Sequence, residues 1–260
     1  MIGEAKLLTK RRRAVLTVRW LLALFALLVL LGAILLSHRQ NVRREVLAAD
    51  PETLLSQSAL RDTVLDGGRS VYMRRCASCH GAAGQGDRAL GVPDLTDADH
   101  LYGDGKVAEI EDIARYGIRA GNKRGWNLAV MPAYGSAVPD KAEPLPPQTP
   151  AQVEDLTQFL LSFTGRASDR SAAERGRTLF QHGAGCWDCH SYDAGGDAAI
   201  GAPTLSDGVW LYGGSHEDIY RSIASGRAGF SPAFGRVLSA IELREVAVYI
   251  ASLAPKGGSR

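Results

Sequence analysis

The longest apolar run of the chain lies near its N-terminus. Residues 20–36 read WLLALFALLVLLGAILL, seventeen positions without a charged side chain. A helix of this length is at the short end of what crosses the hydrocarbon core of a bilayer, and the mostly apolar residues 14–18 extend it. We therefore predict one membrane-spanning helix.

The charged residues on both sides of this run indicate its direction. Six of the nine basic residues in 1–44 precede the run, and that segment holds a single acidic residue. This excess predicts a cytoplasmic N-terminus and a periplasmic remainder. A cleaved signal peptide is the alternative, but its apolar core is shorter and a small-x-small cleavage site follows it at once, whereas His38 and Arg39 follow here. We expect residues 1–44 to form a basic tail and a retained single-pass anchor in the bacterial inner membrane, followed by a linker at 45–65.

Two amphipathic patterns predict helices in the rest of the chain. Thr149 and Pro150 supply an N-cap and a first-turn proline, and apolar residues follow at helical spacing up to residue 163. Residues 239–242, Ser-Ala-Ile-Glu, form a capping-box pattern before a similar stripe that runs to residue 253. Both stripes are typical of helices packed on a core, so the expected fold class is all-α.

Several short segments of the chain occur twice. Leu-Tyr-Gly at 101–103 recurs at 211–213, an offset of 110, and 131–135 (Met-Pro-Ala-Tyr-Gly) resembles 231–235 (Ser-Pro-Ala-Phe-Gly) at an offset of 100. Repetition on this scale indicates two copies of one small fold rather than one large domain. We predict that the copies occupy residues 66–165 and 172–255.

All four cysteines belong to two identical motifs. Residues 76–80 and 186–190 both read Cys-x-x-Cys-His. Two thiols at this spacing can form thioethers to the vinyl groups of one haem, and the adjacent histidine then reaches the iron. A zinc site, a redox dithiol or ordinary disulfides are the alternatives, but zinc needs ligands in fours and the dithiol needs a βαβ context. The motifs predict two covalently bound haem c groups.

These segments together resemble the class I cytochromes c. The shared features are a Gly-x-x-x-aromatic first helix, Cys-x-x-Cys-His, a Pro-Leu-Thr-like loop, Met-Pro and a terminal helix. With the paired Leu-Tyr-Gly and Met-Pro-Ala elements and the single anchor, the chain resembles more narrowly the membrane-anchored di-haem subunit (subunit III) of cbb3-type cytochrome c oxidases. This resemblance implies two tandem cytochrome c domains that pass electrons from donor cytochrome c toward the oxidase's catalytic subunit.

The resemblance also implies axial ligands. Cys76, Cys79, Cys186 and Cys189 would attach the haems, and the alignment of the copies pairs His80 with Met131 on the first iron. His190 would bind the second iron, but Ser231 stands where methionine is expected. That iron is then open, bound to water, or bound by a residue outside the pattern, for which the candidates are His182 and His216. Because a thioether favours reduced iron, we expect the first haem to have the higher potential.

The charge distribution narrows the classes of function. The chain has a net charge of +2, but residues 45–260 hold 21 basic and 27 acidic residues, which argues against a nucleic-acid surface. Such a body would attract basic donor cytochromes. The basic residues of 115–124 form either a solvated loop or a docking rim.

No catalytic residues are predicted, so we expect an electron-transfer subunit. Its expected partners are a membrane-embedded oxidase or another redox complex, donor cytochrome c and the inner membrane. The alternative is a gas-binding or peroxidase-like haem protein.

Overall fold

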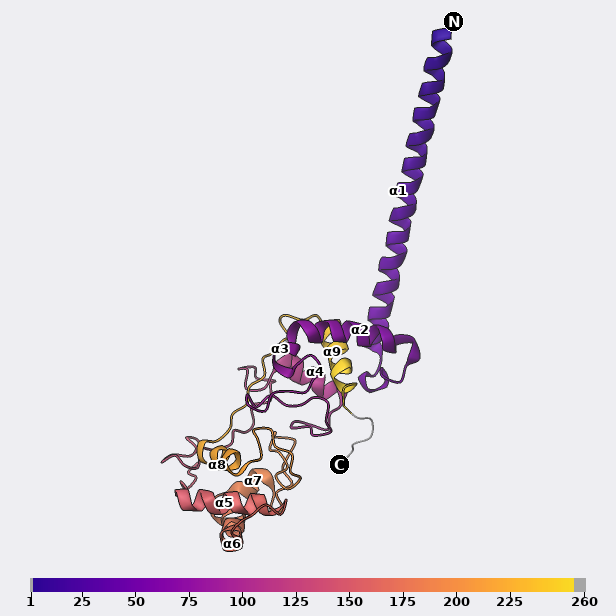
Figure 1. The fold of residues 1–260 in the computed structure, drawn as a ribbon. Helices are drawn as coiled ribbons and strands as arrows, with labels where there is room; N and C mark the ends of the chain where they lie inside the picture. The colour runs from indigo at the N-terminus through magenta and orange to yellow at the C-terminus, as the bar shows by residue number, and fades with distance from the viewer. Residues whose placement is uncertain (1, 255–260) are drawn as a thin grey trace. The chain divides into compact units, whose positions relative to one another are not determined.

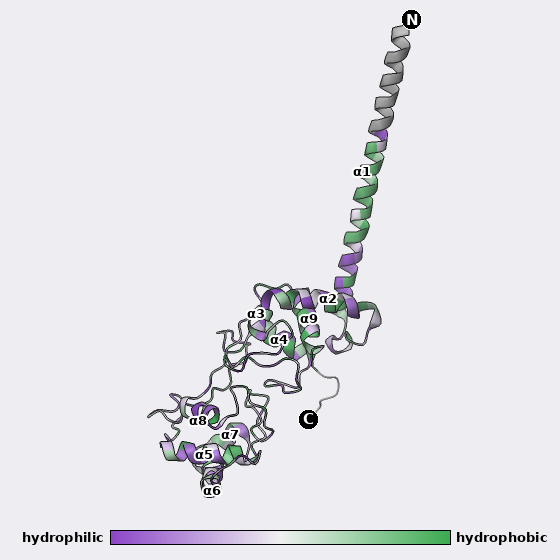
Figure 2. Cartoon of the chain, viewed as in Figure 1, coloured by the Kyte–Doolittle hydropathy of each residue, from purple (hydrophilic) through white to green (hydrophobic). Residues whose placement is uncertain are grey.

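The computed structural model describes the backbone of residues 2–254 and the side chains of residues 19–254. Its first element, α1 (Ile2–Ala48), contains the predicted span and forms a compact unit of its own. The segment Arg19–Ala48 is long and apolar enough to cross a membrane, and Figure 2 shows its apolar stretch in green. The basic side chains before residue 19, on which the predicted direction depends, lie outside the described residues.

The second unit begins at residue 50 and is helical, without a β-strand among the residues described. This agrees with the all-α expectation. Its elements in chain order are the 3-10 turn η1 (Pro51–Thr53), α2 (Ser58–Arg75), α3 (Ala77–His80), α4 (Val107–Tyr116), α5 (Pro150–Ser162), α6 (Arg170–Thr178), the π-helical turn η2 (Leu179–Gly183), α7 (Cys186–His190), α8 (His216–Ser225) and α9 (Ala240–Ala251).

Both helices predicted from capping signals are present. Thr149 caps α5 by accepting a hydrogen bond from the Gln152 backbone N–H, and Pro150 is the first helical residue. Ser239 caps α9 in the same way through Glu242. Such caps satisfy backbone groups that the first helical turn leaves without partners, which is why the short polar signals located these helices correctly.

The packing of the helices does not follow the boundaries of the sequence repeat. Figure 1 shows α2, α3, α4 and α9 in one group and α5, α6, α7 and α8 in another. The principal helix pairs are α2 with α9, α4 with α9, α5 with α6, and α5 with α8. Each repeat therefore gives its terminal helix to the other repeat, and this differs from two copies that each pack on themselves.

The short link between the copies favours this exchange. Only residues 163–169 separate α5 from α6, so the two helices fold back on each other as neighbours. A glycine lets each exchanged pair approach closely. A Cβ added to Gly176 would overlap the Asp155 carbonyl oxygen of α5, and one added to Gly68 in α2 would overlap the Glu245 carbonyl oxygen of α9.

Two hydrophobic cores result, and both contain residues from the two repeats. Val71 and Tyr72 of the first repeat pack with Leu243 and Val246 of the second, next to Cys76. In the other core, the terminal helix of the first repeat packs on helices of the second. Its members include Leu156 and Phe159 from α5, Phe180 from η2, and Ile219 and Ile223 from α8. Neither of these cores is formed by one repeat alone.

Ion pairs join the exchanged helices as well. Asp155 in α5 receives two hydrogen bonds from the Arg175 guanidinium in α6, at 2.6 and 2.9 Å. The Glu111 carboxylate in α4 is buried and contacts both Arg115 of its own helix and Arg244 of α9. Polar side chains therefore fix the same helix pairs that the apolar cores define.

Candidate functional site

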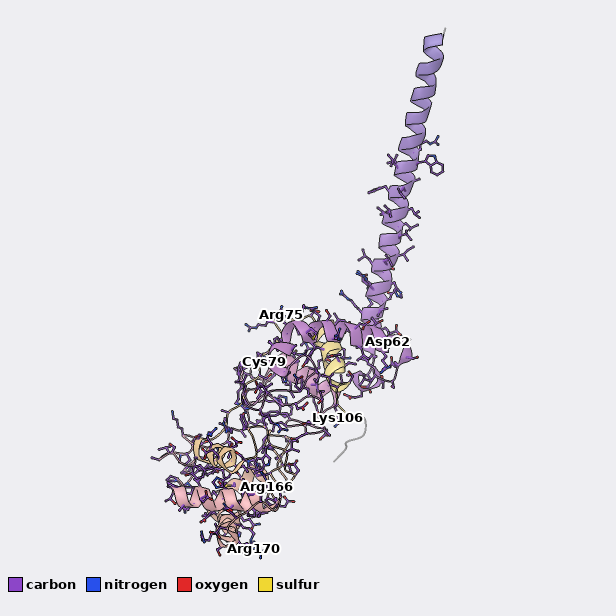
Figure 3. All side chains as sticks on the ribbon, in the orientation of Figure 1. Asp62, Arg75, Cys79, Lys106, Arg166 and Arg170 are labelled. Atoms are coloured by element: carbon purple, nitrogen blue, oxygen red, sulfur yellow. The ribbon has the colours of Figure 1, made fainter. Side chains whose placement is uncertain are left out.

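The two Cys-x-x-Cys-His motifs form short helices at the rims of the two cores. Cys76 follows the last residue of α2, and Figure 3 marks Arg75 and Cys79 on either side of that junction. None of the four cysteines forms a disulfide. Burial raises the pKa of the Cys76 thiol to about 11 and that of Cys186 to about 12. Both sulfurs are thus neutral at physiological pH, unlike the thiolates of redox-active dithiol motifs.

A structural zinc site is not supported in the part of the chain that the structure describes. Those residues contain no group of three or more His, Cys, Asp or Glu side chains placed to hold a metal ion. Thiols in zinc sites come with further thiolate or imidazole ligands around the same ion. The cysteine pairs therefore have the spacing, but not the partners, of a zinc site.

The two motif histidines are held in the same tautomer. Nδ1 of His80 donates a hydrogen bond to the Pro93 carbonyl oxygen at 3.2 Å, and Nδ1 of His190 donates one to the Pro203 carbonyl oxygen at 3.0 Å. Burial lowers the pKa of both imidazoles, which keeps them neutral. With the proton on Nδ1, the lone pair of Nε2 is available to a metal, as in other histidine ligands oriented by a backbone carbonyl.

One cavity of about 1420 Å³ is lined by both motifs. A pocket for a single small molecule is usually between about 300 and 1,000 Å³, so this space is large enough for more than one ligand. Its walls are mainly apolar and come from both repeats. The structure thus provides two pairs of thiols and two imidazoles around one shared interior.

The loop that carries Met131 lies against the second motif. Met131 exchanges two backbone hydrogen bonds with Arg227, at 3.0 and 3.1 Å, just after α8. Its side chain packs in the core that contains Cys186 and Trp210. The neighbouring Tyr134 side chain is buried in the same core. Met131 therefore packs in the core that contains Cys186, whereas the repeat alignment predicts that it pairs with His80.

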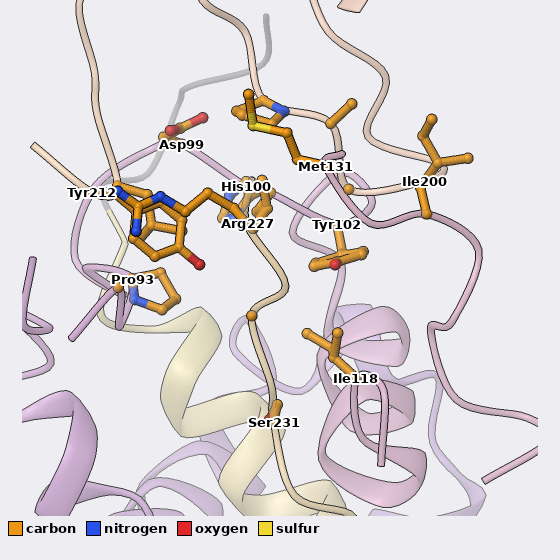
Figure 4. A pocket seen from close by; sticks show the side chains of 18 of the residues that line it. Pro93, Asp99, His100, Tyr102, Ile118, Met131, Ile200, Tyr212, Arg227 and Ser231 are labelled. Carbon is orange, nitrogen blue, oxygen red and sulfur yellow. The ribbon is translucent and has the colours of Figure 1, made fainter. Parts of the chain in front are cut away.

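The corresponding loop of the second repeat lies against the first motif. Ser231 exchanges two backbone hydrogen bonds with Ile118, at 2.9 and 3.0 Å, just after α4. Phe234 packs in the core that contains Cys76. Figure 4 shows Ser231 beside Ile118 and well separated from Met131. Ser231, which carries no sulfur, therefore lies in the loop that packs against the core of Cys76.

Aromatic residues of each repeat reach the loop of the other. A Cβ on Gly91 would collide with the Tyr212 ring, and one on Gly201 would collide with the Tyr102 ring, so each ring lies directly on a glycine of the opposite repeat. The Arg227 guanidinium lies over the Tyr212 ring, 4.2 Å from its centroid. The sequence showed that Leu-Tyr-Gly occurs twice, but it gave no reason to place these tyrosines between the repeats.

Arg119 belongs to the basic segment 115–124, which the sequence leaves as either a solvated loop or a docking rim. Its side chain has partners inside the protein. Arg119 donates hydrogen bonds to the carbonyl oxygens of Gly229 and of Ala129, the latter at 2.8 Å. These carbonyls belong to the Ser231 loop and the Met131 loop. Arg119 therefore connects the two loops, while Lys123 and Arg124 of the same segment are exposed.

The histidines considered as spare ligands lie elsewhere. Nε2 of His216 is 2.9 Å from both carboxylate oxygens of Glu154 in α5, and His216 is the first residue of α8, as its sequence context predicts. The His182 ring packs near Tyr192 with centroids 6.3 Å apart. Neither residue lines the shared cavity.

One buried polar atom beside the second motif lacks a partner in the protein. Trp210 Nε1 is buried and makes no hydrogen bond, although Trp210 lines the cavity. A buried indole N–H without an acceptor is costly, so its presence points to a ligand with an acceptor group at that place. The carboxylate edge of a haem is such a group. Together with the free thiols and the oriented imidazoles, it fits haem c at both motifs.

An all-α chain with two Cys-x-x-Cys-His motifs on one apolar cavity is a c-type cytochrome with two haem sites. Residues 65–164 match the family model of cytochrome c, and residues 171–250 match that of cbb3-type cytochrome c oxidase subunit III. The chain belongs to the family of cbb3-type di-haem subunits that those models and its relatives define.

Relatives in three bacteria illustrate this membership. The cbb3-type cytochrome c oxidase subunit CcoP of Azospirillum brasilense is 35% identical over 80% of this chain and 68% of its own length. Subunit FixP of Azorhizobium caulinodans is 34% identical over 82% of this chain and 65% of its own. Subunit CcoP of Rhodobacter capsulatus is 33% identical over 82% and 70%. The matched region thus spans about two thirds of these relatives.

Proposed function

We propose that this chain is the electron-transfer subunit of a cbb3-type cytochrome c oxidase and carries electrons from a donor cytochrome c to the oxidase. The observation that carries the proposal is the single cavity lined by both Cys-x-x-Cys-His motifs. Two redox groups held in one apolar interior can exchange electrons with little reorganisation of water. The relatives named above are subunits of that oxidase, which supports the same assignment.

In this proposal Cys76 and Cys79 attach one haem and Cys186 and Cys189 attach the other. Each haem supplies reversible one-electron iron chemistry. His80 and His190 bind the irons through Nε2, because Nδ1 is engaged by the Pro93 and Pro203 carbonyls. The apolar walls exclude water, and Trp210 donates its indole N–H to a haem carboxylate.

In the same proposal, Met131 would offer its thioether sulfur to the haem held by His190. The support is the loop packing described above, which places the Met131 side chain in the core beside Cys186. A thioether ligand favours reduced iron and raises the potential. An electron at equilibrium then rests on the second haem, which is the opposite order to that expected from the repeat alignment.

Variants that each lose one haem test this pairing. A chain with Cys186→Ser and Cys189→Ser keeps only the first haem, and its oxidised form should lack the near-infrared charge-transfer band of a His-Met haem. The matched Cys76→Ser, Cys79→Ser chain should keep the band. The reverse result would restore the pairing of His80 with Met131.

We also propose that α1 anchors the chain in the inner membrane and that the haem region lies in the periplasm. The unburied apolar segment of α1 supports anchoring, and the charge excess of residues 1–44 supports the direction. Protease added to spheroplasts should degrade the haem-stained protein, and cytoplasmic marker proteins should survive. A haem region that resists protease until the membrane is lysed would contradict this placement.

Purification of the full chain from membranes tests its place in a complex. A tagged chain solubilised in mild detergent should bring down the oxidase subunits, and oxygen should reoxidise its reduced haems much faster when those subunits are present. The same tag on α1 alone, residues 1–49, is the control for adhesion of the anchor. Recovery of a different redox complex would overturn the assignment to the oxidase.

A further inference from the structure

The Ser231 loop has the same relation to the first motif as the Met131 loop has to the second. Residues 231 and 131 each exchange two backbone hydrogen bonds with the segment after a helix, at Ile118 and Arg227. The two loops also make equivalent hydrogen bonds three residues later. The Phe234 N–H donates to the Ala114 carbonyl at 2.9 Å, and the Tyr134 N–H donates to the Ile223 carbonyl at 3.1 Å. Ser231 therefore faces the first haem site where Met131 faces the second.

The Ser231 side chain cannot close the sixth position of an iron as methionine does. A neutral hydroxyl is a poor ligand for haem iron compared with a thioether or an imidazole. It is also shorter than a methionine side chain, so the same backbone position leaves space between the loop and the iron. The loop is held by its hydrogen bonds to Ile118, which limits how far it can collapse into that space.

His100 is the histidine that lines the cavity outside the motifs, and its place corresponds to that of Trp210. The His100 ring lies on Gly105 so closely that a Cβ there would collide with Nε2, and the Trp210 ring lies on Gly214 in the same manner. Trp210 cannot ligate iron. His100 stands at the equivalent position, packed on Gly105, and Figure 4 shows it apart from Ser231.

The other candidate ligands in the described part of the chain are engaged or distant. Met73 is exposed and lies on α2, one turn before the motif, and it does not line the cavity. His216 pairs with Glu154, and Lys106 pairs with Asp104 at 2.9 Å. No described side chain is thus placed to replace the missing sulfur.

The walls around Ser231 determine which molecules this space suits. The lining residues on the segments that bond or pack with the Ser231 loop are mainly apolar, namely Ile113, Ala114, Ile118, Phe234 and Leu238, and the Arg119 guanidinium also lines the cavity. A small neutral molecule loses little hydration in such surroundings. The space therefore suits neutral diatomic ligands.

We infer that the haem held by His80 keeps an exchangeable sixth position beneath Ser231, and that this position binds neutral diatomic gases such as carbon monoxide and nitric oxide. The haem held by His190 is closed by Met131. This rests on haem attachment at both motifs, as proposed above. The first haem is then a gas-responsive site in a chain whose second haem serves electron transfer.

Carbon monoxide titration of the purified, reduced full chain tests the inference. Denatured mass first establishes that both haems are attached, because a chain with only one haem overturns the proposed function itself. With both attached, the Soret change should saturate at one carbon monoxide per chain. Titration of the oxidised chain with cyanide should leave the His-Met band intact. Two haems and no carbon monoxide binding would overturn the inference alone.

Variants assign the site to Ser231. Ser231→Met should abolish carbon monoxide binding and add a second near-infrared His-Met band, whereas Ser225→Met, at the exposed end of α8, should change neither. Ser231→Ala should bind the gas as the unaltered chain does, which keeps the test decisive if Ser231→Met fails to fold. Binding of carbon monoxide with loss of the single His-Met band would place the gas on the second haem and overturn the inference.

Discussion

At the scale of single residues, backbone carbonyls and buried polar atoms determine what each haem site can do. The prolines at 93 and 203 each offer a carbonyl to the Nδ1 of a motif histidine, so both imidazoles have the same orientation. The sites differ at their edges, where His100 and Trp210 occupy equivalent places. This asymmetry should be visible in the potentials of the haems.

Trp210→Phe should lower the midpoint potential of the second haem. The indole N–H has no acceptor in the protein, and in the proposed complex it donates to a haem carboxylate. Loss of that donor leaves more negative charge beside the iron and favours the oxidised state. Redox titration should show one component moved to lower potential, and Trp187→Phe, which replaces an indole whose ring centroid is 4.8 Å from that of Tyr192, should not move it. An unchanged potential in Trp210→Phe would exclude this hydrogen bond.

At the scale of elements, the exchange of terminal helices is the main feature that the sequence did not reveal. The motifs, the capped helices and the anchor were all predicted, because each depends on local spacing. The partner of a helix is not a local property, and the apolar stripes of α5 and α9 are similar enough to fit either repeat. The short link between Ser162 and Arg170 was the available signal, since it makes α5 and α6 neighbours.

The same limit explains the Met131 pairing. Met131-Pro132-Ala133 indicates a ligand loop, but the identity of its haem depends on where the chain crosses between the cores. That crossing occurs after α4 and after α8, where Ile118 and Arg227 bind the loop of the other repeat. Alignment of the repeats could find the loop but could not find its partner.

Glu111→Gln should destabilise the pair formed by α4 and α9. The carboxylate is buried and contacts both Arg115 and Arg244, so its neutralisation removes the negative charge that the two guanidinium groups share. Loss of one partner from such a cluster costs about 3–5 kcal/mol in free energy of unfolding. Chemical denaturation measures the change, and Lys106→Gln, which breaks an exposed pair with Asp104, is the control that should change little. Equal stability of the two variants would argue against the cluster.

Gly176→Ala should weaken the contact between α5 and α6. The added methyl group would meet the Asp155 carbonyl, a rigid backbone atom, so the helices must separate. Overpacking of this kind costs about 1–3 kcal/mol. Thermal unfolding followed by circular dichroism should show a lower midpoint, whereas Gly32→Ala in α1, where nothing lies within 4 Å, should unfold as the unaltered chain does. A midpoint equal to that of the control would contradict the close approach.

At the scale of the whole molecule, residues 50–254 should unfold in one step. Both cores contain helices from both repeats, so neither core can persist when one repeat is lost. Chemical denaturation followed at the first-haem and second-haem Soret bands and by circular dichroism should give coincident curves. A chain cut after residue 165 should fail to form a stable first haem pocket. Two separate transitions, or a stable truncated pocket, would show that the repeats fold independently.

The crossing of the chain between the cores also sets an order for biosynthesis. His80 emerges early from the ribosome and the export channel, but the loop and the helix that cover its pocket, Ser231 and α9, are the last parts to emerge. The parts that surround the second pocket, Met131, α5 and α8, have all been synthesised once α8 is complete. The haem of the first motif must therefore wait, attached and uncovered, until the end of the chain arrives, and premature termination near the C-terminus would damage the haem encoded first.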